Sequence, residues 1–291
     1  MGAAVLFALA WRLLASKVKR PELGALSFLG RIAPWIPRLL GIHLGVSLLS
    51  LAVTNTYLSP NLSLEDVAGG AGIAFVEGLI GVWLISGVLL RPAFALVVVL
   101  GPLALVLAGP IAMLEAADLL GIALFLIVLP PGRDSYGARR GDADVVRTAV
   151  WALKVCLGVA LIVVAFTEKL ANPALAQGFL QSNPAFNVFQ GLGLAVTDSF
   201  FIRFAGTVEI ALGLLILSGG MPQLMVLLAG IPFNATLFFL GRTELIGHLP
   251  IYGAMLALLV YGSVPSLAPQ VAALSPLPTR PRRPRVPEPV P

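Results

Sequence analysis

The sequence has very few of the residues that carry redox and metal chemistry. It contains one cysteine, Cys156, and two histidines, His43 and His248, in 291 residues. A single thiol can neither form an intramolecular disulfide nor cycle as a dithiol. A zinc site needs three or four ligands, so one histidine among carboxylates is a poor candidate. We therefore expect no metal site and no redox cofactor encoded by the chain itself.

Motifs of several common enzyme classes are also missing. The sequence has no phosphate-binding loop, no dinucleotide-binding glycine pattern and no nucleophile elbow. His43 and His248 are expected near opposite faces of a membrane, which excludes a haem held between two histidines at one depth. These absences exclude several common kinds of enzyme.

Charge is scarce as well. Only 11% of the residues are charged, whereas 58% are hydrophobic, and soluble domains carry about 25% charged residues. Most of the surface must therefore face lipid. Backbone groups inside a bilayer have to be satisfied internally, which helices achieve, and the alternating pattern of a membrane barrel is absent. The fold class expected is all-α, a polytopic membrane protein with the lipid bilayer as its first partner.

Long apolar runs predict about eight transmembrane helices, since each span needs ~20 mostly apolar residues. The expected spans are 36–57, 69–89, 92–108, 110–129, 148–168, 199–219, 222–240 and 243–264. We interpret 1–35 as an interfacial amphipathic segment, although residues 1–15 could instead be a short extra span. Residues 36–130 form a first four-helix unit, 131–147 a linker, and 148–264 a second unit. Residues 265–291, rich in proline and arginine, are expected to be a disordered tail.

The basic residues predict the orientation. In this layout 16 of the 19 Lys and Arg residues fall on one side of the membrane, which the positive-inside rule assigns to the cytoplasm. Both termini and the 131–147 linker are then cytoplasmic, in the cell membrane of a bacterium. Basic residues placed beside spans do not indicate nucleic-acid binding, and none is expected.

An internal repeat relates the two units. Gly45, Thr54 and Pro60 match residues 113 positions later, and the Val-Glu pair at 76–77 matches the pair at 208–209, 132 positions later. The difference between the offsets predicts an insertion in the second unit, within 174–198. Each unit has an even number of spans, so both enter the membrane in the same direction and the repeats are parallel.

Polar side chains at membrane depth are costly, so each is a candidate for function. Nearly all of them are expected in the outer half of the bilayer, where they would line a cavity if they point inward. The first unit contributes Asn55, Glu77, Glu115 and Asp118. The second unit contributes Glu168, Lys169, Arg203, Glu209, Asn234, Arg242, Glu244, His248 and Tyr252.

The repeat helps to sort these candidates. Glu77 and Glu209 occupy equivalent positions, which favours a structural hydrogen bond between helices. The other second-unit groups differ in residue type from their first-unit equivalents, which suggests that the second unit holds the working site. Simpler alternatives remain open. Lys169 and Arg242 could reach the outer headgroups. Glu168 could form a surface ion pair with Lys169, and Arg203 could pair with a nearby acid. His248 could cap the last span.

Three motifs carry a resemblance to a known family. They are Thr-Glu-Lys-Leu-Ala-Asn-Pro at 167–173, Ala-Gly-Thr-Val-Glu at 205–209 and Gly-His-Leu-Pro-Ile-Tyr-Gly at 247–253. Together they resemble the DoxX/DoxD family of small membrane proteins, over about 150–263 and more weakly over 39–129. The resemblance implies a four-helix unit and, through the thiosulfate:quinone oxidoreductase subunits after which the family is named, a link to quinones. This chain differs by having two units, the first without the Glu-Lys and His-Leu-Pro motifs.

Two functions follow as hypotheses. In the first, the protein is a quinone-linked membrane oxidoreductase or a subunit of one, and a partner subunit or the substrate supplies the electrons. Glu168, His248 and Tyr252 would then relay protons to the quinone, while a second set would bind it: Lys169, Arg203, Glu209, Asn234, Arg242 and Glu244. In the second, the protein is a non-catalytic scaffold or assembly subunit whose intramembrane polar groups hold other helices.

Overall fold

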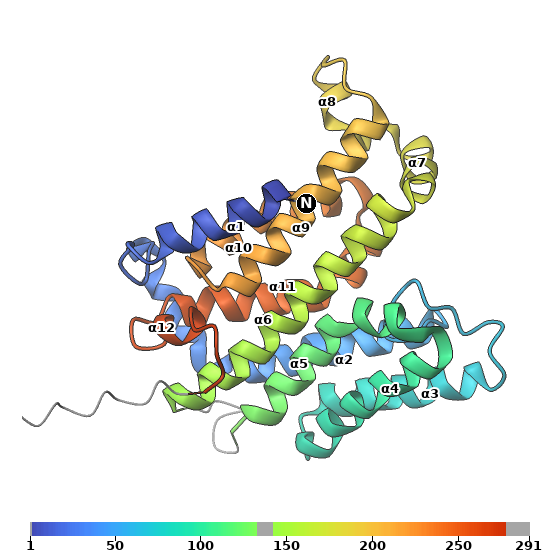
Figure 1. Cartoon of the computed structure of the whole chain (residues 1–291). Coiled ribbons are helices and arrows are strands. Elements are labelled where there is room, and N and C mark those ends of the chain that lie inside the picture. Colours follow the sequence, from blue (N-terminus) through green and yellow to red (C-terminus); the bar gives the residue numbers. More distant parts are fainter. Residues whose placement is uncertain (1, 133–141, 278–291) are drawn as a thin grey trace, which may run out of the picture.

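The computed structural model describes residues 2–132 and 142–277, with only the backbone for Leu240, Arg242, Thr243, Glu244 and Ile246. All the regular secondary structure in these residues is helical, as expected (Figure 1). Five described helices are long and apolar enough to cross a membrane, and four shorter apolar helices accompany them. The chain is therefore a helical membrane protein.

Four helices of the first half pack in a ring. They are α2 (Ile36–Val53), α3 (Gly70–Ser86), α4 (Leu90–Glu115) and α5 (Ala117–Val128). Each packs against the next, and α5 returns to α2. A short 3₁₀ segment, η1 (Gly24–Trp35), leads directly into α2.

Four helices of the second half pack in the same order. They are α6 (Ala143–Ala165), α9 (Asp198–Ser218), α10 (Pro222–Leu240) and α11 (Arg242–Gly262). Again each contacts the next, and α11 returns to α6. Between α6 and α9 lie a π-helical turn, η2 (Phe166–Ala171), and the short elements α7 (Pro173–Ser182), η3 (Pro184–Phe186) and α8 (Val188–Gly191). This is where the repeat offsets predict an insertion.

The third and fourth predicted spans differ from the observed helices. The chain leaves the helical conformation at Gly109, at φ 84° and ψ −177°, where the boundary between these spans is expected. However, α4 resumes at Pro110 and continues to Glu115, and α5 begins only at Ala117. Since proline fits the first turn of a helix and lacks the N–H that would bond backwards, Pro110 restarts a helix after the break. The fourth predicted span is thus divided at Ala116.

Close helix crossings occur at equivalent positions in the two halves. A methyl group built on Gly45 in α2 would lie 2.7 Å from the carbonyl oxygen of Gly81 in α3. A methyl group on Gly158 in α6 would lie 2.9 Å from the carbonyl oxygen of Gly213 in α9. Glycine lets helix backbones approach this closely, as is common in membrane bundles. The first two helices of each half therefore pack through the residues that the repeat equates.

The two halves contact each other reciprocally. Gly121 in α5 packs on Cys156 in α6, and Gly253 in α11 packs on His43 in α2. Gly121 and Gly253 are repeat equivalents, and Cys156 follows His43 by the 113 residues of the first offset. Thus the fourth helix of each half packs against the first helix of the other half.

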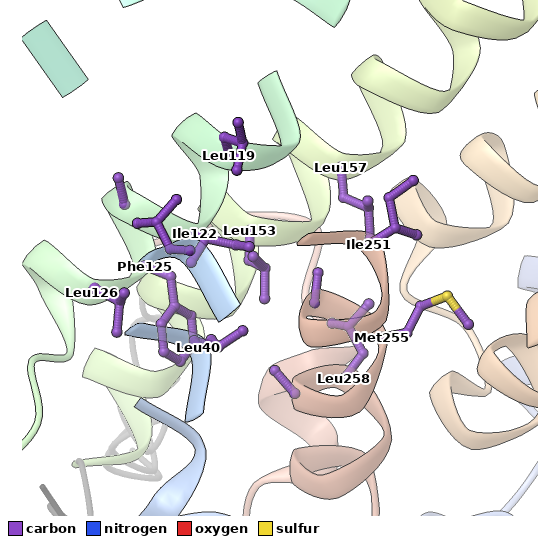
Figure 2. Close-up of a cluster of buried hydrophobic side chains, with 14 of the residues drawn as sticks. Leu40, Leu119, Ile122, Phe125, Leu126, Leu153, Leu157, Ile251, Met255 and Leu258 are labelled. Carbon is purple, nitrogen blue, oxygen red and sulfur yellow. The ribbon is translucent and has the colours of Figure 1, made fainter. Parts of the chain in front are cut away.

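The apolar core lies along this seam between the halves (Figure 2). Phe125 from α5, Leu153 from α6, Leu40 from α2 and Leu258 from α11 are each at most 1% exposed. Side chains from four helices fill the same volume, so neither half encloses this core alone. Inside a bilayer such a seam is stabilised by close packing of side chains, because lipid is as apolar as the side chains themselves.

The amino-terminal helix α1 (Gly2–Ala15) packs lengthwise against α9. Ala4 clusters with Ile210 in the middle of α9, while the indole Nε1 of Trp11 donates to the carbonyl oxygen of Gly220, just beyond the end of α9, at 2.7 Å. The opposite face of α1 exposes Leu6, at 68%, and Leu13, at 69%. Helix α1 thus packs along α9, and the interfacial segment and the short extra span both stay predictions for residues 1–15.

Part of the predicted disordered tail is folded. Residues 265–277 include α12 (Ala268–Val271) and pack on α6. Lys154, 1% exposed, donates from Nζ to the carbonyl oxygens of Val271 and Ala273. Arg12 donates to Ala272 at 2.9 Å. The prediction of disorder is wrong here because buried and half-buried cations need acceptors, which the backbone of this segment provides. Residues 278–291 lie outside the described part of the chain.

Candidate functional site

A π-helical turn at the end of α6 positions the first group of polar residues. In η2 the helix widens over Phe166–Ala171, a rare conformation that is frequent at functional sites. Lys169 on this turn lies with its Nζ 2.9 Å from Oε2 of Glu209 in α9 and 4.0 Å from Oε2 of Glu168. All three side chains are 23–30% exposed. They form a half-buried ion cluster with a formal charge of −1.

Side chains from the first half complete this cluster. Asn61 donates from Nδ2 to Oε1 of Glu168 at 2.8 Å. The hydroxyl of Thr167 donates to Oε1 of Glu115, at the end of α4, at 2.9 Å. The sequence analysis names Glu115 among the polar candidates but assigns it no catalytic or quinone-binding role, and it does not include Asn61 or Thr167. Predicted outer depth could have identified Thr167, the chain neighbour of Glu168, whereas no local signal marks Asn61 in the loop after α2.

Glu77 and Glu209 both hold the segment that follows the first helix of their own half. Oε1 of Glu77 accepts from the backbone N–H of Leu58 at 3.1 Å, and Glu77 is 0% exposed. Glu209 binds Lys169. These contacts agree with the structural alternative for this pair, but Glu209 is also a member of the ion cluster.

His248 and Tyr252 lie one turn apart on α11, against the ring of Phe233 in α10. The ring centroids of His248 and Phe233 are 5.2 Å apart, edge to face, and those of Tyr252 and Phe233 are 6.4 Å apart. The Tyr252 hydroxyl donates to the carbonyl oxygen of Phe233 at 2.8 Å. Since α11 already begins at Arg242, His248 lies inside the helix. The alternative in which His248 only caps the last span is therefore wrong.

An open groove of about 420 Å³ runs between α10 and α11. Its walls are mostly apolar, with Asn234 and Tyr252 as the polar side chains among the lining residues. Asn234 is exposed, and its Nδ2 donates to the carbonyl oxygen of Gly230 at 2.7 Å. The amide still has a second N–H and a carbonyl oxygen that can bond a ligand. The groove thus combines a long apolar wall with amide and phenol groups.

The loop after α2 contacts both α11, beside His248, and the ion cluster. A methyl group on Gly247 would lie 3.9 Å from Pro60 in this loop, and the next loop residue, Asn61, binds Glu168. Asp118 at the start of α5 interacts electrostatically with His248. Direct coupling of His248 to Glu168 stays a prediction.

The remaining predicted residues are placed differently. Arg203 is exposed, and its Nε donates to the carbonyl oxygen of Ser199 in its own helix at 3.1 Å, so its described bond is within α9 rather than to the ion cluster. The side chains of Arg242 and Glu244 lie outside the described part of the structure, and only their place in the first turn of α11 is known. Among the described residues, no group of three or more His, Cys, Asp or Glu side chains could hold a metal ion.

Together, the fold and the two sites define the class: a helical membrane protein with a half-buried ion cluster beside an apolar groove. Comparison with known proteins adds no narrower identity, since no protein-family model, no curated protein and no solved structure matches the chain.

Proposed function

We propose that this protein binds a lipid-soluble small molecule with a polar head, of the quinone class, in the groove between α10 and α11. The observation that carries the proposal is the groove itself, with Asn234 and Tyr252 on an otherwise apolar wall. Small-molecule sites are typically apolar clefts with a few placed polar groups. A quinone carbonyl oxygen would accept from the second N–H of Asn234 or, in exchange for the Phe233 carbonyl, from the Tyr252 hydroxyl, and the apolar tail would follow the groove.

Within this proposal the protein is a quinone-linked oxidoreductase subunit. Reduction of a quinone to a quinol takes up two electrons and two protons. A partner subunit with a flavin or metal centre would supply the electrons. His248 and Tyr252 lie one turn apart beside the groove, and the ion cluster with Glu168 lies across the loop after α2. These residues are suited to carry protons from the aqueous surface to the quinone oxygens.

The membrane topology belongs to the same proposal. Eight spans in two parallel four-helix units account for the matching order of packing and the equivalent glycine crossings in the two halves. The reciprocal contacts of α5 with α6 and of α11 with α2 fit a pseudo-twofold axis along the membrane normal. The charge asymmetry supports a cytoplasmic-membrane location with both termini inside. The motifs on η2, α9 and α11 support membership of a DoxX/DoxD-like family.

A second candidate function is a scaffold or assembly subunit. Two hydrogen bonds between the halves favour it: Asn61 donates to Glu168, and Thr167 donates to Glu115. Such contacts hold helices together and require no bound molecule. In this case the groove would receive a helix of a partner protein instead of a quinone.

The experiment that separates the two candidates measures quinone binding. Purified wild type, His248→Ala, Tyr252→Phe and Ala116→His are incubated with a short-chain benzoquinone, and bound quinone is determined by equilibrium dialysis. We expect saturable binding by wild type and about tenfold weaker binding by Tyr252→Phe, which corresponds to ~1.4 kcal/mol. His248→Ala should also weaken binding, while Ala116→His, the first-half counterpart, should equal wild type. Equal binding by all four proteins would contradict the quinone site and favour the scaffold.

A further inference from the structure

Most of the segment between α6 and α9, from residue 170 to 197, contains no charged residue. Residues 170–197 have no Asp, Glu, Lys or Arg, yet they form the projecting elements α7, η3 and α8. In Figure 1 these elements extend beyond the end of the helix bundle where α9 begins. Loops that leave a membrane for water normally carry charge, so a charge-free projection of this length needs an explanation.

The same segment exposes large apolar side chains. Leu192 is 75% exposed, Leu175 56% and Leu194 51%. Exposed apolar area of this kind costs about 25 cal/mol per Å² in water. In this segment it is accompanied by neutral polar groups such as Gln177 and Asn183, which can reach headgroups or water.

Phenylalanine rings connect this segment to the spanning helices. Phe186 in η3 meets Phe179 of α7 at a ring-centroid distance of 5.2 Å and Phe239 of α10 at 5.7 Å. Phe189 of α8 meets Phe204 of α9 at 5.6 Å. Next to these rings, Phe238 on α10 is 84% exposed. The apolar surface of the projection is therefore continuous with the lipid-facing surface of α9 and α10.

We propose that residues 170–197, the aromatic wedge, lie in the headgroup layer of the bilayer. The wedge would insert its exposed leucine and phenylalanine side chains among the lipids at the end of the bundle where α9 begins. Short amphipathic elements with leucine and phenylalanine on their apolar face are stabilised at this depth by buried apolar area. Because the wedge has no charge, its insertion requires no anionic lipid. The continuity with α9 and α10 favours lipid over a protein partner as its occupant.

The wedge belongs to one half of the repeat only, and it contacts a helix of the groove. The insertion is present only in the second half, and its η3 contacts the end of α10, the helix that forms one wall of the groove. The wedge thus anchors the outer end of that wall in the lipid. This inference is independent of what the groove binds.

The test places a nitroxide on the wedge in lipid nanodiscs. In a Cys156→Ala background, Leu192→Cys is labelled and its collisions with oxygen, which prefers lipid, and with a water-soluble nickel complex are measured. Val106→Cys on α4, where Val106 is 80% exposed, gives a lipid reference. Glu65→Cys, at an exposed position of the 58–69 loop, gives a water reference.

We expect Leu192→Cys to show an oxygen preference between the two references. This oxygen preference should be the same whether the nanodiscs contain only zwitterionic lipid or also contain anionic lipid. Nickel accessibility equal to that of Glu65→Cys would overturn the inference. A label shielded from both reagents would also overturn it, because shielding would show that a second protein chain covers the wedge.

Discussion

The ammonium nitrogen of Lys169 lies 2.9 Å from a carboxylate oxygen of Glu209, with the carboxylate of Glu168 4.0 Å away on the other side. One cation thus stands between two acids, on a π-helical turn inside a membrane bundle. Removing the cation leaves two like charges near each other, whereas removing one acid leaves a simple ion pair. The three residues are therefore not equivalent in their effect on stability.

Lys169→Met is expected to lower the free energy of unfolding more than Glu209→Gln does. The coupling between the two changes should be about 1 kcal/mol, because the side chains are only half-buried and water screens them partly. Unfolding of both single variants and the double variant in mixed detergent micelles gives the coupling. Additive effects would show that the 2.9 Å contact contributes nothing.

The glycine crossings should be equally sensitive in the two halves. Gly81→Ala and Gly213→Ala each place a methyl group within 2.7–2.9 Å of atoms of the crossing helix, and such overpacking costs about 1–3 kcal/mol. Gly72→Ala in α3 is the control, since its methyl group meets nothing within 4 Å and alanine favours a helix.

The measurement is the apparent Tm in detergent. A decrease for both crossing variants with no decrease for Gly72→Ala supports equivalent units. A decrease in only one half would argue against the repeat as a packing unit.

Two truncations of the carboxy-terminal region should differ in their effect on the Tm. Removing residues 278–291 is expected to leave the Tm nearly unchanged, because a segment rich in proline and arginine cannot bury enough apolar area to become ordered. Removing residues 268–291 should lower the Tm by several degrees, since Lys154 then loses the carbonyl oxygens of Val271 and Ala273. In that shorter chain, Lys154→Met should restore part of the loss, because it removes the buried charge. Equal Tm values for both truncations would contradict the docking of 268–277.

The orientation can be tested by labelling in intact cells. In the Cys156→Ala background, Ser182→Cys at the end of α7 should react with a membrane-impermeant maleimide. Ser135→Cys, in the 131–147 linker, should react only after the cells are permeabilised. The basis is the charge asymmetry of the loops. Labelling of Ser135→Cys in intact cells would reverse the topology.

Most helices could be predicted from the sequence, because a long apolar run is compatible with few structures other than a membrane-spanning helix. The expected span 222–240 coincides with α10, and the break at Gly109 falls where proline and glycine indicate it. The docked tail could not be predicted, because its stability depends on carbonyl oxygens that accept from Lys154, a long-range contact without a local pattern.

The sequence indicated several residues of the candidate site, but it did not indicate how these residues are arranged. Depth in the membrane selected Glu168, Lys169 and Tyr252, since any polar group there stands out. It could not indicate that they divide between an ion cluster and a groove, because the separation depends on how α10 and α11 pack. It also gave no reason to choose Asn61, whose role comes from the fold of the loop after α2.

Filling the groove tests the central claim most directly. A methyl group on Gly230 would meet only the Asn234 amide, at 3.6 Å, so Gly230→Leu can be accommodated while its side chain occupies the groove. Gly72→Leu, on an open face of α3, is the matched control. Binding of a photoreactive short-chain quinone is measured for both variants and wild type, and the crosslinked peptides are mapped by mass spectrometry. The account predicts crosslinks in α10 and α11 for wild type and Gly72→Leu, and at least about tenfold weaker binding for Gly230→Leu. Unchanged binding by a folded Gly230→Leu, or crosslinks confined to other helices, would contradict it.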